Sequence, residues 1–172
     1  FLAMVSIGII SAQIGSRAIW TIPSTFVLIM IVGGLIGIYA EMNQLLKSAA
    51  LNEIGQTFIL ANFLYLLIEI GILISVITLG LAIAIEKKLP VGMTMIFVGI
   101  FGFFHGSAHG LAMPWATNPF LFALGFATGT ATLHIFGVII GYFAIKTKLS
   151  AVLLRIVGIC FAVIGIYSLI IF

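Results

Sequence analysis

The chain has 172 residues, of which 63% are hydrophobic and 6% are charged. A soluble domain carries roughly 25% charged residues, so a chain this poor in charge cannot cover its own surface in water. The net charge of +3 comes from basic residues at the ends of apolar runs. Topology explains these residues, and they do not indicate nucleic-acid binding.

The apolar residues fall in runs of about 20 or more, which is long enough for a helix to cross a hydrocarbon core. A chain within a bilayer must satisfy its backbone hydrogen bonds internally, which leaves helices or a closed barrel. The runs show no period-two alternation, and this excludes the barrel. We therefore predict an all-α integral membrane protein.

The first apolar run, residues 1–14, would rise only about 21 Å as a helix, against a hydrocarbon core of about 30 Å. We interpret it as the tail of a truncated first span. A second span is predicted over residues 20–40, with Pro23 in its first turn, where a missing N–H does no harm. The more polar stretch 41–57 is either an interfacial amphipathic helix or a helical extension of its neighbours.

Four further apolar runs complete about six transmembrane helices in a single domain, residues 1–172. These runs cover residues 58–85, 91–111, 120–145 and 149–172. Small residues at four-residue intervals let membrane helices approach closely, so we expect a Gly-packed bundle. The glycines concerned are Gly102, Gly106, Gly110, Gly125, Gly129, Gly137 and Gly141.

Basic residues are distributed unequally between the two sets of connections, six against one. Cytoplasmic loops carry the excess of Lys and Arg, so the richer set is predicted to face the cytoplasm. Both chain ends would then lie on the outer side of a bacterial-type inner membrane. The richer set holds Arg17, Lys87, Lys88, Lys146 and Lys148, with Arg155 just inside the last predicted span, and the poorer set holds Lys47.

Four strongly polar side chains interrupt the predicted spans: Glu69, His105, His109 and His134. Inserting such a side chain into the membrane within a spanning helix costs about 2.5–3.5 kcal/mol, so we expect each to have a functional or structural role. A rise of about 1.5 Å per residue places all four within about two helical turns of one another in depth. Imidazole and carboxylate ligands suit Ni²⁺, Co²⁺, Zn²⁺ or Cu²⁺, so we predict that these four residues form a metal site. The competing interpretation is that the histidines are hydrogen-bonded packing residues.

The stretch 104–110, FHGSAHG, followed by Pro114, resembles the FHGxAHGxExP signature of the HupE/UreJ family. The family comprises small membrane proteins associated with hydrogenase and urease gene clusters and regarded as nickel or cobalt permeases. Glu69 occupies the place of the family's acidic residue in the third span. Two differences stand out: Ala112 replaces an acidic residue of the signature, and the family's HPxxGxDH motif would lie just before Phe1.

The resemblance implies a permease, not an enzyme, that carries Ni²⁺ or Co²⁺ inward through the His/Glu site without a permanently bound cofactor. The expected partners are the lipid bilayer and the metal ion, with a homo-oligomer or a larger membrane complex left open. Two alternatives remain. Two histidines, such as His109 and His134, could hold a haem in a redox subunit. The chain could instead be a structural or assembly subunit whose histidines only form hydrogen bonds.

Overall fold

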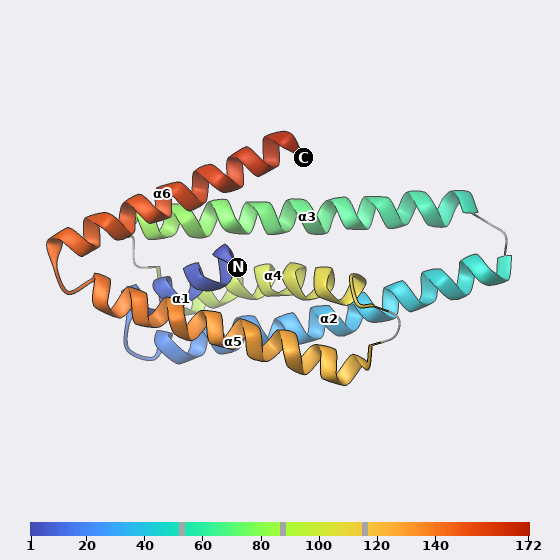
Figure 1. The fold of residues 1–172 in the computed structure, drawn as a ribbon, viewed down its shortest axis with the longest axis horizontal. Helices are drawn as coiled ribbons and strands as arrows, with labels where there is room; N and C mark the ends of the chain where they lie inside the picture. Colours follow the sequence, from blue (N-terminus) through green and yellow to red (C-terminus); the bar gives the residue numbers. More distant parts are fainter. Residues whose placement is uncertain (52–53, 87–88, 115–116) are drawn as a thin grey trace.

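The computed structural model of the protein describes residues 1–51, 54–86, 89–114 and 117–172, and their side chains outside residues 44–61. Within these residues the chain forms six α-helices and no strand, as Figure 1 shows. Five of them are long and apolar enough to cross a membrane, and α1 is shorter. The predicted all-α fold class is confirmed. The helices are α1 (Leu2–Ile14), α2 (Ala18–Leu51), α3 (Ile54–Ile85), α4 (Val91–Leu111), α5 (Pro119–Ala144) and α6 (Lys148–Ile171).

Local sequence signals set several of the helix ends. Gly15 ends α1 with φ 78°, a left-handed conformation that glycine adopts without a steric penalty. The side chain of Asn118 accepts hydrogen bonds from the first turn of α5, and Pro119 occupies the first helical position. Thr147 caps α6 by accepting a hydrogen bond from the main-chain N–H of Ser150.

Helix α2 is longer than predicted at both ends. It begins at Ala18, so Pro23 lies in the second helical turn, where it removes one hydrogen bond of the helix. At the other end, the polar stretch 41–57 is helical on both sides of residues 52–53, which lie outside the described residues. Of the two predicted conformations for this stretch, the helical extension is the one observed.

Three helix pairs pack most closely: α2 with α4, α1 with α5, and α3 with α6. Glycines form the point of closest approach in each pair. A methyl group on Gly106 of α4 would collide with the main-chain oxygen of Met30 in α2. Gly8 and Gly137 face each other between α1 and α5, as Gly80 and Gly158 do between α3 and α6. The expected Gly-mediated packing is therefore present.

Two predicted packing glycines do not take part. A methyl group on Gly125 or Gly129 would meet no atom of the described residues within 4 Å. Helix α5 packs on α1 through Gly137 and Gly141 instead. The four-residue spacing of glycines therefore does not show which of them make a close contact.

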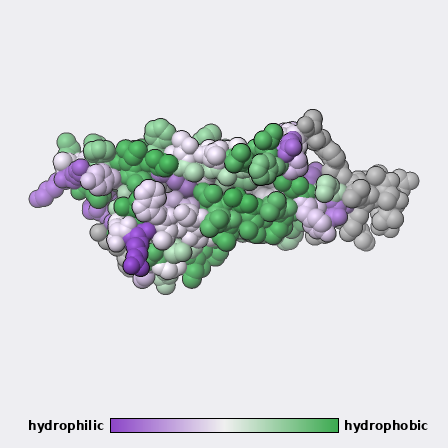
Figure 2. Space-filling view, turned by 90° about the horizontal axis from the view of Figure 1, so that it is seen from below, coloured by the Kyte–Doolittle hydropathy of each residue, from purple (hydrophilic) through white to green (hydrophobic). Residues whose placement is uncertain are grey.

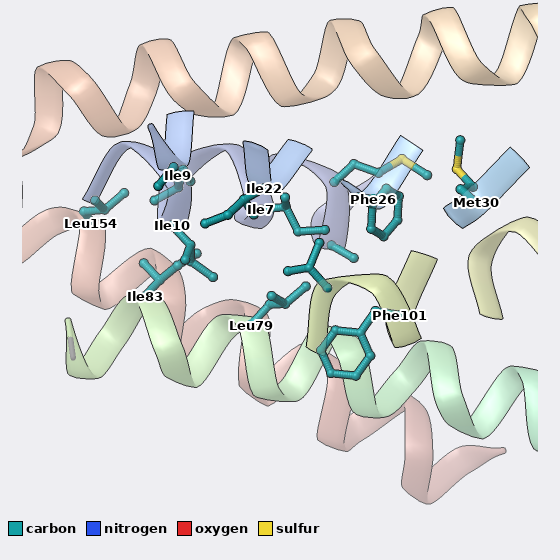
Figure 3. Close-up of a cluster of buried hydrophobic side chains, with 14 residues drawn as sticks. Ile7, Ile9, Ile10, Ile22, Phe26, Met30, Leu79, Ile83, Phe101 and Leu154 are labelled. Atoms are coloured by element: carbon teal, nitrogen blue, oxygen red, sulfur yellow. The ribbon is translucent and has the colours of Figure 1, made fainter. Parts of the chain in front are cut away.

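The core of the bundle lies where α1 meets its neighbours. Most of the 13 residues of α1 are buried, although it is the shortest helix described. Figure 3 shows this cluster, with Phe26 and Met30 of α2 at one end of it. Its labelled members are Ile7, Ile9, Ile10, Ile22, Phe26, Met30, Leu79, Ile83, Phe101 and Leu154.

The connections α1–α2, α3–α4 and α5–α6 lie at one end of the molecule, and α2–α3 and α4–α5 lie at the other (Figure 1). Figure 2 shows hydrophobic residues over the middle of one face and hydrophilic residues toward the ends. At the three-connection end, Arg155 of α6 donates to the Glu86 carboxylate at the end of α3, with Nε 3.1 Å from Oε2. This arrangement is that of an integral membrane protein.

Candidate functional site

Phe26 of α2 brings two of the predicted histidines together. Its ring is fully buried and contacts the imidazole of His105 from α4, with ring centroids 5.5 Å apart. The imidazole of His134 from α5 contacts the same ring at 5.1 Å and an interplanar angle of 90°. Both contacts have the edge-to-face geometry that aromatic rings favour. Side chains from three helices therefore meet within the bundle.

Hydrogen bonds to the main chain orient both imidazoles. Nδ1 of His105 lies 2.9 Å from the carbonyl oxygen of Phe101, and Nδ1 of His134 lies 2.7 Å from that of Met4. A carbonyl oxygen only accepts, so Nδ1 carries the proton and donates it in each case. In the neutral ring, Nε2 then holds a free lone pair. Metal-binding histidines commonly have this arrangement, in which the other ring nitrogen donates to a carbonyl.

The Nε2 atom of His134 is exceptional among the buried polar atoms. The residue is 2% exposed, and this nitrogen has no hydrogen-bond partner within the described part of the chain. Leaving a buried acceptor unpaired costs about 1–3 kcal/mol. Buried polar groups without partners are rare, and each requires an explanation.

Two methionine sulfurs lie beside Thr130, one helical turn before His134 on α5. The hydroxyl of Thr130, one turn earlier on α5, is 3.8 Å from Sδ of Met4 in α1 and 3.6 Å from Sδ of Met30 in α2. The sequence did not single out these methionines or Phe26 as site residues. Apolar side chains are the rule in spanning helices, so only the packing of α1 and α2 against α5 reveals them.

His109 lies apart from Phe26. Its half-buried ring stacks on Phe126 of α5, with centroids 5.2 Å apart and an interplanar angle of 2°. It is one helical turn beyond His105, toward the connection between α4 and α5. This position makes it the most accessible of the three histidines.

Glu69 lies on a different side of the structure from the histidines. Its exposed side chain lines a groove of about 400 Å³ between α3 and the end of α6, where Ser168 and Ile171 contribute. On the same stripe of α3, the hydroxyl of Tyr65 donates to the Glu41 carboxylate of α2 at 3.1 Å.

The predicted four-residue metal site is not assembled in this conformation. Among the residues whose positions are described, no three His, Cys, Asp or Glu side chains lie close enough to hold one metal ion. His105 and His134 meet at Phe26, whereas His109 and Glu69 stand elsewhere. Equal depth along two helices does not bring side chains together, because the rotation of each helix about its axis also matters. Helix α3 packs on α6 and leaves Glu69 beside it.

Comparison with known proteins gives the family. The chain matches the family described as HupE / UreJ protein over residues 1–45 and 40–168. It is 34% identical over 137 residues to Protein HupE from Rhizobium leguminosarum bv. viciae, covering 80% of this chain but only 60% of that protein. No solved structure matches the chain. On these matches the chain belongs to the HupE/UreJ family.

Proposed function

We propose that this protein is a membrane permease that carries a divalent transition-metal ion, Ni²⁺ or Co²⁺, inward. The observation that carries the proposal is the pair of buried imidazoles, His105 and His134, each held by a carbonyl at Nδ1. In His134, Nε2 is also buried without a hydrogen-bond partner among the described residues. Polar residues within membrane-spanning segments are costly and usually functional. Membership of the HupE/UreJ family supports the same assignment.

The ligands suit an ion that passes through rather than one that stays. Imidazole nitrogens bind Ni²⁺ and Co²⁺ well. Within the described residues, no three His, Cys, Asp or Glu side chains form a closed cage that would trap the ion. Permeation requires binding that is weak enough to allow release. His109, the most accessible histidine, makes the first contact, and His105 and His134 take the ion deeper.

Asparagine substitutions test this role without disturbing the fold. In His105→Asn and His134→Asn, the amide nitrogen takes the place of Nδ1 and donates to the same carbonyl, whereas nothing replaces Nε2. We expect cellular uptake of labelled nickel and cobalt to fall by about tenfold or more, the scale of losses at altered metal sites. Immunoblots of membrane fractions measure whether the variants are produced normally.

Thr132→Asn serves as the matched control, because it introduces the same amide on the exposed face of α5. Its uptake should equal that of the unmodified protein. Normal uptake by both histidine variants, at normal protein level, would contradict the proposed role of these imidazoles.

A further inference from the structure

The sulfurs of Met4 and Met30 meet on the same buried face of α5 that carries His134. Thr130 and His134 are four residues apart, so their side chains stack on one face of the helix. The hydroxyl of Thr130 touches both sulfurs, and the main chain of Met4 also holds Nδ1 of His134. Met4 is 6% and Met30 0% exposed. Residues of α1, α2 and α5 thus meet in one buried cluster, formed by Met4, Met30, Thr130 and His134.

This cluster has more hydrogen-bond acceptors than hydrogen-bond donors. A thioether sulfur accepts hydrogen bonds weakly and donates none, and Nε2 of His134 is an acceptor when Nδ1 carries the proton. The Thr130 hydroxyl has a single proton, so it can serve only one sulfur at a time. Packing alone accounts for two methionines in a core. It does not account for a histidine whose Nε2 is buried without a partner.

We propose that His134, Met4 and Met30 form a position that binds a largely dehydrated transition-metal cation through Nε2 and the thioether sulfurs. The inference rests on the proposed permease function and names the part of the path that sets selectivity. Thioether and imidazole ligands favour softer transition-metal ions, whereas Mg²⁺ and Mn²⁺ prefer oxygen. Phe26 contacts both imidazoles, so its ring lies beside the route that an ion would take from His105 to this position.

The test removes the sulfurs and keeps the volume. Exchanges between Met and Leu usually cost less than about 1.5 kcal/mol, so the Met4→Leu/Met30→Leu double variant should fold. X-ray absorption of the purified protein loaded with Ni²⁺ should show sulfur and nitrogen ligands, and the double variant should lose only the sulfur. In cells, the ratio of nickel to manganese uptake should fall by about tenfold. Met93→Leu, on an exposed part of α4, is the control and should change neither result.

The outcomes separate this inference from the permease function. Nickel bound without sulfur in the unmodified protein, or an unchanged uptake ratio in the double variant, would overturn the inference and leave the permease intact. Absence of nickel and cobalt uptake by the unmodified protein would overturn both. If the double variant is poorly produced, the single variants Met4→Leu and Met30→Leu give the same comparison.

Discussion

At the residue scale, His105 and His134 differ in which carbonyl accepts the hydrogen bond from Nδ1. His105 donates to Phe101, four residues earlier in the same helix, so its orientation moves with α4. His134 donates across to Met4 in α1, so its orientation depends on the contact between α1 and α5. A shift of α1 relative to α5 would release His134 but leave His105 in place. His134 is therefore the imidazole whose orientation would change if α1 moved relative to α5.

Phe26 should be the most important apolar residue for stability near the site. It is fully buried and contacts both imidazoles. Phe26→Ala removes these contacts and leaves a cavity, so we expect a loss of about 3–5 kcal/mol of unfolding free energy. Reversible unfolding in detergent micelles measures the loss. Phe136→Ala, on the exposed side of α5, is the control and should change the unfolding free energy by about 0.5 kcal/mol or less. Equal losses in the two variants would show that Phe26 contributes no more to stability than an exposed phenylalanine.

The sequence identifies polar site residues better than apolar ones. His105 and His134 stand out because each is costly in an apolar run. Met4 and Met30 do not, because any spanning helix contains such residues. The sequence predicted Glu69 beside the histidines from its height along α3, and the structure places it in a groove between α3 and α6. Counting residues gives height along a helix and not the direction of the side chain.

At the element scale, the spans follow from the sequence but their pairing does not. Apolar runs and turn signals such as Gly15 and Asn118 predict where helices begin and end. In lipid, however, both the buried and the outward faces of a helix are apolar, so hydropathy does not mark the contact face. The glycine pairs of α4 and α5 have the same spacing, yet Gly106 packs against α2 while Gly129 contacts nothing described.

This difference between glycines predicts opposite effects of one substitution. In Gly106→Ala the new methyl group meets the Met30 main chain, and relieving the collision should cost about 1–3 kcal/mol. In Gly129→Ala the methyl group meets open space, and loss of glycine's backbone freedom should stabilise the helix by about 0.5–1 kcal/mol. Thermal melting in detergent measures both. A Gly106→Ala protein as stable as the parent would show that α2 and α4 do not approach this closely.

At the scale of the whole molecule, the α3–α6 pair is set off from the helices that carry the histidines. An apolar cavity of about 630 Å³ lies between α1, α3 and α4, with Gln13 and Glu86 among its few polar lining residues. Glu69 belongs to the α3–α6 pair, whereas His105 and His134 belong to α4 and α5. For Glu69 to share an ion with the histidines, α3 would have to turn or slide against α4. In the structure as it stands, Glu69 is thus separated from the two imidazoles by the packing of α3 on α6.

The distribution of basic residues over the two ends predicts how the molecule sits in its membrane. The three connections at one end carry the excess of Lys and Arg, so this end should face the cytoplasm. In a Cys160→Ala background, which removes the one exposed free thiol described, a membrane-impermeant maleimide should label Ala112→Cys in intact spheroplasts. It should label Lys148→Cys only after the membrane is opened.

Inward transport would then start at the end of α4 nearest His109 and pass His105 before His134. Labelling of Lys148→Cys in intact spheroplasts would reverse the orientation, and the accessible histidine would become the exit from the path rather than its entrance.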